Sequence, residues 1–158
     1  MDREASLRDH LSRVLAWQDA HATFEVAVED IPSSHRGRVP KGLPYSPWQL
    51  VEHLRITQHD ILDFCRNPKY VEMHWPDDYW PKSATPPSDT AWDESVRHFL
   101  EDRAALQALA ADRSVDLLAT IPHGSGQTYL RELLLVADHT SYHLGQLLAV
   151  RRLLGIWT

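Results

Sequence analysis

The sequence predicts an all-α protein, a four-helix bundle with long connecting loops, folded as one domain over residues 1–158. Four segments repeat apolar residues at the three- and four-residue steps of an amphipathic helix. Residues that start or stop helices flank most of these segments. The chain has 158 residues, of which 43% are hydrophobic and 24% charged, a composition typical of one soluble globular domain.

The first predicted helix extends from about residue 3 to residue 29. Ile31-Pro32 then ends the helical pattern, because proline disfavours a helical residue before it. The link over residues 32–45 holds three prolines and two glycines and is predicted to be irregular. The apolar stripe of this helix consists of Leu7, Leu11, Val14, Leu15, Gln18 and Ala22.

The second predicted helix runs from about residue 47 to residue 66. Ser46 is expected to be its N-cap, Pro47 fits the first helical position, and Gln49 completes a capping box. The link over residues 67–89 is long for a connection without its own structure. It contains five prolines and several aromatic residues, so we expect a packed loop that covers one end of the bundle. These ring-bearing residues are Tyr70, His74, Trp75, Tyr79 and Trp80.

The third predicted helix covers about residues 90–111, and its possible N-caps are Ser88, Asp89 and Thr90. The fourth covers about residues 128–154, and Gly155 is a natural C-terminal stop. A turn-rich link over residues 120–127, containing a proline and two glycines, separates them.

The overall charge and the single cysteine limit the expected partners and location. The formal net charge is −6, which argues against nucleic acid, since such binding draws on lysine and arginine side chains that neutralise phosphates. Cys65 has no second cysteine to pair with, which favours the reducing cytoplasm, and we expect it to be a small buried hydrophobe. No apolar run is long enough to span a membrane.

The strongest chemical pattern is a pair of histidines, His139 and His143, in the fourth predicted helix. Residues four apart lie about 40° apart on one helix face and one turn apart along it. Both positions fall on the side that also carries Leu135, Leu147 and Val150. A buried imidazole needs partners for one donor and one acceptor, so two on an apolar face require an explanation.

His53 adds a third imidazole to the apolar face of the second predicted helix. Histidines that converge in a bundle interior are a common way to bind metal, and three protein ligands leave positions open for water or substrate. His53, His139 and His143 are therefore the predicted ligands of one divalent metal ion, which could be Zn, Ni, Fe or Mn. The competing interpretation is that they are hydrogen-bonded core histidines.

Three polar residues near these histidines are candidates to orient them: Glu52, Asp138 and Gln146. Glu52 and Asp138 directly neighbour a candidate ligand in sequence and so point about 100° away from it, which favours solvated positions. Most other histidines are expected at the surface, whereas three remain open: His21 near the inner stripe, and His74 and His123 at a pocket mouth. The expected surface histidines are His10, His35, His59 and His98.

Two passages resemble the DinB-like superfamily, including its YfiT-like metal-dependent members. They are residues 46–53, which end in His53, and residues 138–146, which contain His139 and His143. Residues 121–128 and 75–80 resemble one branch of it, so the resemblance covers nearly the whole chain. It implies a four-helix bundle with an unusual connection order, three histidines on a divalent metal, and a homodimer.

The resemblance also implies a range of activities. Characterised members of the superfamily include S-transferases and isomerases that use low-molecular-weight thiols. We therefore expect a metal-dependent thiol S-transferase or hydrolase that acts on a small electrophilic molecule. The alternative is a non-catalytic module that binds a metal or small ligand, for example in a stress response, because no general base is evident in the sequence.

Overall fold

Six α-helices form the framework of this computed structural model, which describes residues 2–17 and 19–157, and these residues contain no β-strand. The predicted all-α class is confirmed. None of the described helices is long and apolar enough to cross a lipid bilayer. The helices are α1 (Arg3–Val14), α2 (Phe24–Val28), α3 (Ser33–Arg36), α4 (Pro47–Arg66), α5 (Asp89–Ala111) and α6 (Tyr129–Leu153).

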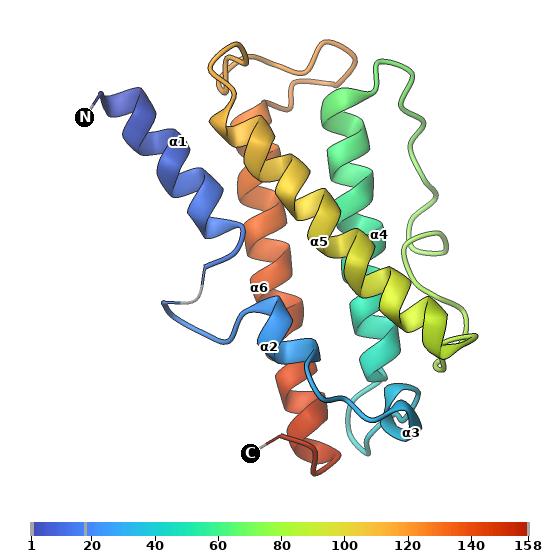
Figure 1. Ribbon diagram of the computed structural model, residues 1–158. Helices are drawn as coiled ribbons and strands as arrows, with labels where there is room; N and C mark the ends of the chain where they lie inside the picture. Colours follow the sequence, from blue (N-terminus) through green and yellow to red (C-terminus); the bar gives the residue numbers. More distant parts are fainter. Residues whose placement is uncertain (1, 18, 158) are drawn as a thin grey trace.

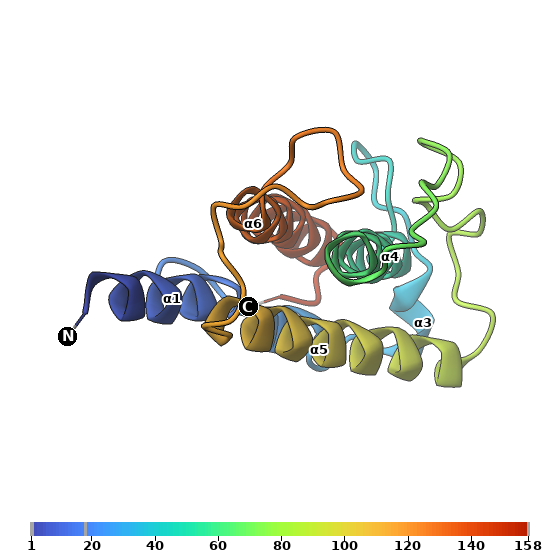
Figure 2. The same cartoon turned by 90° about the horizontal axis from the view of Figure 1, so that it is seen from above.

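The four longer helices lie in two layers. Figure 2 shows α4 and α6 side by side in one layer and α1 and α5 in the other. In Figure 1, α5 crosses obliquely in front of the pair, and α6 runs in the opposite direction to α4. The densest packing joins α4 to α5 and α4 to α6, so α4 is central to the fold.

The prediction of one helix over residues 3–29 is wrong. α1 ends at Val14, and a separate short helix, α2, begins at Phe24 after Thr23, whose side chain caps it. The break lets the chain supply two different parts of the core: Leu15 packs near α5 and α6, whereas Phe24 stacks on Phe99 with ring centroids 3.8 Å apart. Tertiary packing thus overrides the helical periodicity. Gln18 of the expected stripe lies outside the described residues.

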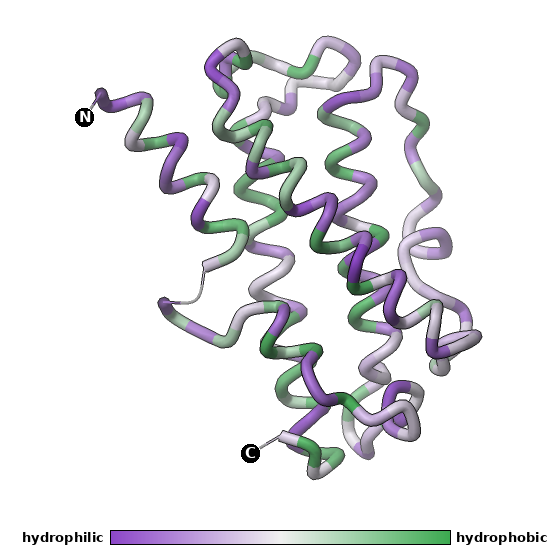
Figure 3. The backbone as a smooth tube through the Cα atoms, in the orientation of Figure 1, coloured by the Kyte–Doolittle hydropathy of each residue, from purple (hydrophilic) through white to green (hydrophobic). Residues whose placement is uncertain are grey.

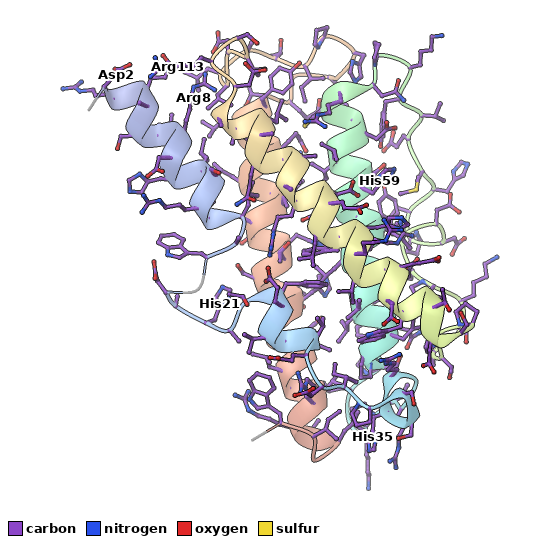
Figure 4. All side chains as sticks on the ribbon, viewed as in Figure 1. Asp2, Arg8, His21, His35, His59 and Arg113 are labelled. Atoms are coloured by element: carbon purple, nitrogen blue, oxygen red, sulfur yellow. The ribbon has the colours of Figure 1, made fainter. Side chains whose placement is uncertain are left out.

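The apolar stripe predicted for α1 is only partly correct. Leu7 is 44% exposed, and the buried position next to it is held by Arg8, which is 5% exposed. The Arg8 guanidinium donates to the backbone carbonyls of Ala110, Asp112 and Val115 at the end of α5. Figure 4 shows Arg8 between α1 and this end of α5. A buried arginine is tolerated there because carbonyl groups satisfy its donors.

The predicted helix ends are confirmed for α4, α5 and α6. Ser46 and Gln49 form both hydrogen bonds of the capping box, and Pro47 is the first helical residue of α4. Of the three possible caps for α5, Ser88 accepts the hydrogen bond, from the Ala91 amide. α6 is followed by Gly155, whose φ of 72° fits the left-handed conformation that stops a helix.

The core fills the space between the two helix layers. In Figure 3 hydrophobic and hydrophilic stretches alternate along α4, α5 and α6, as in amphipathic helices. Phe99 and Leu106 of α5, together with Leu50 and Leu54 of α4 and Leu147 of α6, are fully buried. This packing fixes α4 against α6, the two helices that carry the candidate site.

The link between α4 and α5 was predicted to cover one end of the bundle, and this prediction is wrong. The link runs along the length of α4. Figure 1 shows why: α4 and α5 both run upward, so the chain must return from the top of α4 to the bottom of α5. On its way the link contacts α4 through Tyr70 and Tyr79, which donate to Asp60, and through the Ala84 carbonyl, which accepts from Ser46.

Candidate metal centre

The structure brings the three predicted histidines together between α4 and α6. His53 lies in the middle of α4, and His139 and His143 lie one turn apart on α6. The Nε2 atom of His53 is 3.2 Å from the Nε2 atoms of both His139 and His143. His53 and His143 are buried, and His139 is half-buried. One ligand atom from each ring lies within 4.8 Å of the other two, so the group could hold a metal ion.

The opposite nitrogen of each ring faces a hydrogen-bond partner. His53 Nδ1 lies 2.7 Å from the Tyr79 carbonyl oxygen, and His143 Nδ1 lies 2.7 Å from Gln146 Oε1. A carbonyl oxygen and an amide oxygen can only accept, so both Nδ1 atoms carry the proton. His139 Nδ1 is 3.4 Å from Thr57 Oγ1, whose own hydrogen is directed to the His53 carbonyl. The same tautomer therefore fits all three rings.

This tautomer leaves three Nε2 lone pairs pointing at a common point. His53 Nε2 lies 3.2 Å from the other two Nε2 atoms, and three acceptors cannot hydrogen-bond to one another, so the arrangement calls for a cation between them. Imidazole nitrogens bound at about 2.0–2.1 Å to one tetrahedral ion lie roughly 3.3–3.4 Å apart. The donor set and its spacing thus fit a divalent metal ion.

Burial keeps the three rings neutral. It lowers the pKa of His53 to about 4, and burial together with repulsion from the two neighbouring rings lowers the pKa of His139 to about 3. The pKa of His143 is lowered as well, mainly by burial. Neutral imidazole is the form that binds metal, so near neutral pH no proton has to leave before binding.

An aromatic stack from the α4–α5 link closes one side of the cluster. The Trp80 ring lies flat on the His53 ring, with centroids 3.7 Å apart and planes 5° apart. Tyr45 stacks on the other face of Trp80 at 4.3 Å. On α6, Tyr142 meets the edge of His143 at 4.9 Å. The stack of Trp80 and Tyr45 covers one face of the His53 ring and restricts its rotation.

Comparison with models of known protein families identifies the family of this chain. The model of the DinB superfamily matches residues 16–147, which is most of the sequence. The chain belongs to the DinB superfamily. No curated protein and no solved structure gives a significant match. The two passages that carry the histidines of this DinB protein, residues 46–53 and 138–146, fall within the matched range.

This DinB protein has a cavity of about 560 Å³ between α4, α6 and two loops, and its lining does not include His53, His139 or His143. Tyr79 joins the cavity to the histidines, because its carbonyl accepts from His53 while its hydroxyl donates to Asp60 in the cavity wall. Burial, together with the hydrogen bond to Asp60, raises the pKa of Tyr79 to about 12 and raises that of Tyr70. Both phenols therefore stay protonated and act as donors.

The rest of the cavity wall combines apolar, polar and charged side chains. His123 Nε2 donates a hydrogen bond to the Phe64 carbonyl, and the buried Glu132 pairs with Arg131. Of the two histidines left open for a pocket mouth, His123 lines this cavity, whereas His74 is exposed and is not part of its lining. The full lining is Asp60, Ile61, Phe64, Tyr70, Glu72, Tyr79, His123, Gly124, Ser125, Gln127, Arg131, Glu132 and Leu135.

Of the three residues considered as orienting partners, only Gln146 contacts a histidine of the cluster. Glu52 pairs with Arg55, and Asp138 is exposed. The expectation that these two carboxylates point away from the ligands is confirmed. Cys65 is buried as predicted, and burial raises the pKa of its thiol to about 12, so it remains a protonated thiol.

The other histidines lie away from the cluster. His10, His59 and His98 are exposed as expected, but His35 is only half-exposed and contacts Ser34 and Arg38. His21 is exposed in the segment before α2, and its Nδ1 contacts the adjacent Ala22 carbonyl. Figure 4 shows His21, His35 and His59 on separate parts of the molecule. His21 is therefore not a partner of the cluster.

Sequence reasoning missed two contributors, the Tyr79 carbonyl and the Trp80 ring. The passage over residues 75–80 carries part of the family resemblance. However, Tyr79 is 26 residues from His53 in the sequence, and no pattern in the passage indicates that the two are in contact. A backbone carbonyl carries no sequence signal at all. In the sequence, Trp80 is one aromatic residue among several in a long loop, and no pattern distinguishes it from Trp75.

Proposed function

We propose that this DinB protein binds one divalent metal ion through the Nε2 atoms of His53, His139 and His143. The observation that carries the proposal is the shared tautomer: outer partners hold each Nδ1 proton, so three lone pairs converge. Within residues 2–17 and 19–157 the group that could hold the ion has three protein ligands, which leaves room for an exogenous ligand and is typical of catalytic sites. Imidazole ligands suit zinc, nickel and iron, and manganese fits the same open site less well.

We further propose that the protein is a metal-dependent enzyme, a thiol S-transferase or a hydrolase acting on a small electrophilic molecule. When bound, a divalent ion supplies Lewis acidity, which lowers the pKa of a coordinated thiol or water toward neutrality. The chain's own residues orient the three imidazoles, and Trp80 covers one face of the His53 ring. The cavity between α4 and α6, connected to His53 through Tyr79, offers Asp60, Tyr70 and Tyr79 for binding a polar substrate.

Metal content and affinity test the first step. Elemental analysis of the untreated protein should find about one equivalent of metal, and titration of the metal-free protein with zinc should show one site. His53→Ala, His139→Ala and His143→Ala should each weaken that site strongly. His59→Ala is the matched control, because His59 lies on α4 but faces Asp102 on α5. Equal zinc affinity in all four variants would contradict the proposed site.

Turnover tests the second step. The metal-loaded protein would be assayed with a panel of low-molecular-weight thiols and electrophiles, and with ester and amide substrates without thiol. Activity that disappears with a chelator and returns with metal supports an enzyme. Tight binding of a small ligand without turnover supports the alternative, a non-catalytic module in the same superfamily.

A further inference from the structure

The cavity between α4 and α6 carries an excess of negative charge. Its wall contains the carboxylates of Asp60, Glu72 and Glu132, but Arg131 is the only arginine or lysine in it. The Arg131 guanidinium is already paired with the buried Glu132 carboxylate, at 2.6 Å. In the described part of the chain neither Asp60 nor Glu72 forms an ion pair. The cavity therefore holds two carboxylates whose charge no arginine or lysine side chain balances.

The polar atoms of the wall are mostly hydrogen-bond acceptors. The Tyr70 hydroxyl donates to Asp60 Oδ1 and the Tyr79 hydroxyl donates to Asp60 Oδ2, each at 2.9 Å. His123 Nε2 donates to the Phe64 carbonyl at 2.8 Å, so in the neutral ring Nδ1 is an acceptor. Because these donors are used inside the protein, the phenol oxygens, the ring nitrogen and the carboxylates are left to accept from a ligand. A polar molecule that binds here has to bring donors of its own.

Aromatic and aliphatic side chains form the apolar part of the same wall. Phe64 meets Tyr70 edge to face, with ring centroids 5.1 Å apart, and meets His123 in the same manner at 5.4 Å. Ile61 and Leu135 add aliphatic surface. Aromatic rings attract cations and also pack against hydrocarbon chains. The wall thus suits a ligand with a short hydrocarbon part and a positively charged head.

A metal ion and an organic anion fit this wall less well. The three carboxylates do not lie close enough together to hold a metal ion; over residues 2–17 and 19–157 the histidine cluster is the group that does. An anion would face Asp60 and Glu72, and Arg131 could bind it only by leaving the buried Glu132 without its partner. The volume of about 560 Å³ is that of a small-molecule site.

We propose that this cavity binds a small organic molecule with a primary ammonium group, and that Asp60 is the ion-pair partner of that group. An ammonium carries three N–H donors and no acceptor, which matches a wall rich in acceptors. Aliphatic amines with a pKa near that of lysine, about 10, are protonated at neutral pH. Tyr70 and Tyr79 hold the two oxygens of Asp60, so the carboxylate is oriented before the ligand arrives.

The position of the cavity relates this ligand to the candidate metal centre. Asp60 follows His53 by seven residues on α4, and Glu132 precedes His139 by seven residues on α6. Because the two helices run in opposite directions (Figure 1), both steps lead the same way, roughly 10 Å along the bundle. The inference deepens the proposed function, on which it rests only for the role of the ligand as a substrate: an electrophile anchored by its ammonium at this distance from the metal. Binding of the ammonium does not itself require the metal.

Probes of similar size and different charge test the ligand class on the metal-free wild-type protein. Isothermal titration calorimetry would compare 2-phenylethylamine, which is protonated, with neutral 2-phenylethanol and anionic 3-phenylpropionate. The amine should bind at one site with a dissociation constant at least about tenfold lower than that of the other two. Its N,N,N-trimethyl derivative keeps the charge but lacks donors and should bind more weakly than the primary amine.

Three results with these probes would overturn the proposal. The first is equal or tighter binding of 3-phenylpropionate. The second is a trimethyl derivative that binds as tightly as the primary amine, since donors would then not matter. The third is no binding of 2-phenylethylamine at millimolar concentration.

Substitutions at Asp60 and Tyr70 locate the site. Asp60→Asn keeps the shape of the side chain but removes its charge, and should raise the dissociation constant of 2-phenylethylamine about 10–100-fold. Asp63→Asn is the matched control, because it makes the same change at a half-buried position on α4 outside the cavity wall. Tyr70→Phe removes one donor that orients Asp60 and should raise the constant about 2–10-fold, which keeps the test valid if Asp60→Asn folds poorly. Unchanged affinity in a folded Asp60→Asn variant, or in Tyr70→Phe where Asp60→Asn does not fold, would overturn the proposed site.

His53→Ala separates this proposal from the metal centre. No histidine of the cluster lines the cavity, so this variant should bind 2-phenylethylamine like the metal-free wild type even though its zinc affinity is lost. Asp60→Asn should show the reverse, weak amine binding with zinc affinity retained. Amine binding that needs zinc and is insensitive to Asp60→Asn would mean that the metal captures the amine, and would overturn the cavity site while leaving the metal centre intact.

Discussion

Replacing Gln146 with alanine should weaken metal binding while leaving the fold intact. Gln146 Oε1 accepts the Nδ1 proton of His143 at 2.7 Å. Without this acceptor the proton can sit on either nitrogen and the ring can turn, so the Nε2 lone pair no longer points reliably toward His53. Losing such a partner costs about 10–100-fold in metal affinity at comparable sites, equivalent to about 1.4–2.8 kcal/mol.

The assay is competition for zinc between the metal-free protein and a chromophoric chelator near neutral pH. Gln146→Glu should keep the affinity near that of the wild type, because a carboxylate also accepts the His143 proton. Glu52→Ala and Asp138→Ala serve as controls, since these carboxylates neighbour a histidine in sequence without contacting it. Circular dichroism checks that α6 remains folded.

The reasoning about the tautomer would be refuted by either of two results. In the first, Gln146→Ala binds zinc as tightly as the wild type. In the second, Glu52→Ala or Asp138→Ala weakens zinc binding as much as Gln146→Ala, which would mean that general charge near the site matters more than the orientation of His143.

Three further predictions concern the Trp80 ring, the protonation of the histidine cluster, and the buried Arg8. Trp80→Ala should lower the free energy of unfolding by about 1–3 kcal/mol, because it removes two ring stacks; Trp75→Ala, at a 70% exposed position, is the control in the same urea titration. The metal-free protein should lose stability as the pH falls from about 6.5, because burial lowers the pKa of His53 to about 4 and of His139 to about 3. The unfolded chain then binds protons that the folded chain does not, so the urea midpoint should drop between neutral and acidic pH but stay constant above neutrality. Arg8→Ala should cost about 1.5–3 kcal/mol, since it removes charged hydrogen bonds between α1 and the end of α5, and hydrogen exchange should show α1 opening first.

The sequence predicts helices well where local signals determine them. Ser46, Pro47 and Gln49 give the start of α4 without reference to the rest of the chain, because a capping box is made within four residues. Gly155 likewise marks the end of α6 through a conformation that favours glycine. Such ends depend only on neighbouring residues, so the sequence alone is enough to place them.

The region before α4 shows where local reasoning fails. Residues 3–29 have the periodicity of one helix, yet Phe24 is drawn to Phe99 on α5 and Thr23 starts a new helix. Arg8 is buried while Leu7 is exposed, because carbonyl acceptors more than 100 residues away satisfy the guanidinium. Periodicity cannot report partners that distant, since they exist only in the folded chain.

In the candidate metal centre, too, some features could be predicted from local sequence and others depend on the folded chain. The spacing of His139 and His143 is local, and their position on an apolar face pointed to a third imidazole on another helix. The partners that set the tautomers are of two kinds. Gln146 lies on the same helix as His143 and could be proposed from spacing. The Tyr79 carbonyl reaches His53 only through the path of the α4–α5 link.

That path explains why a long, aromatic link is part of the site. α4 and α5 run in the same direction, so the chain has to travel back along α4 before α5 can begin (Figure 1). The return brings Tyr79 level with His53, where its carbonyl holds the Nδ1 proton and its hydroxyl holds Asp60 in the cavity wall. Trp80, the next residue, then covers the His53 ring. A short turn to an antiparallel helix would have left His53 without either contact. The connection order of the helices is thus what turns three nearby histidines into three oriented ones.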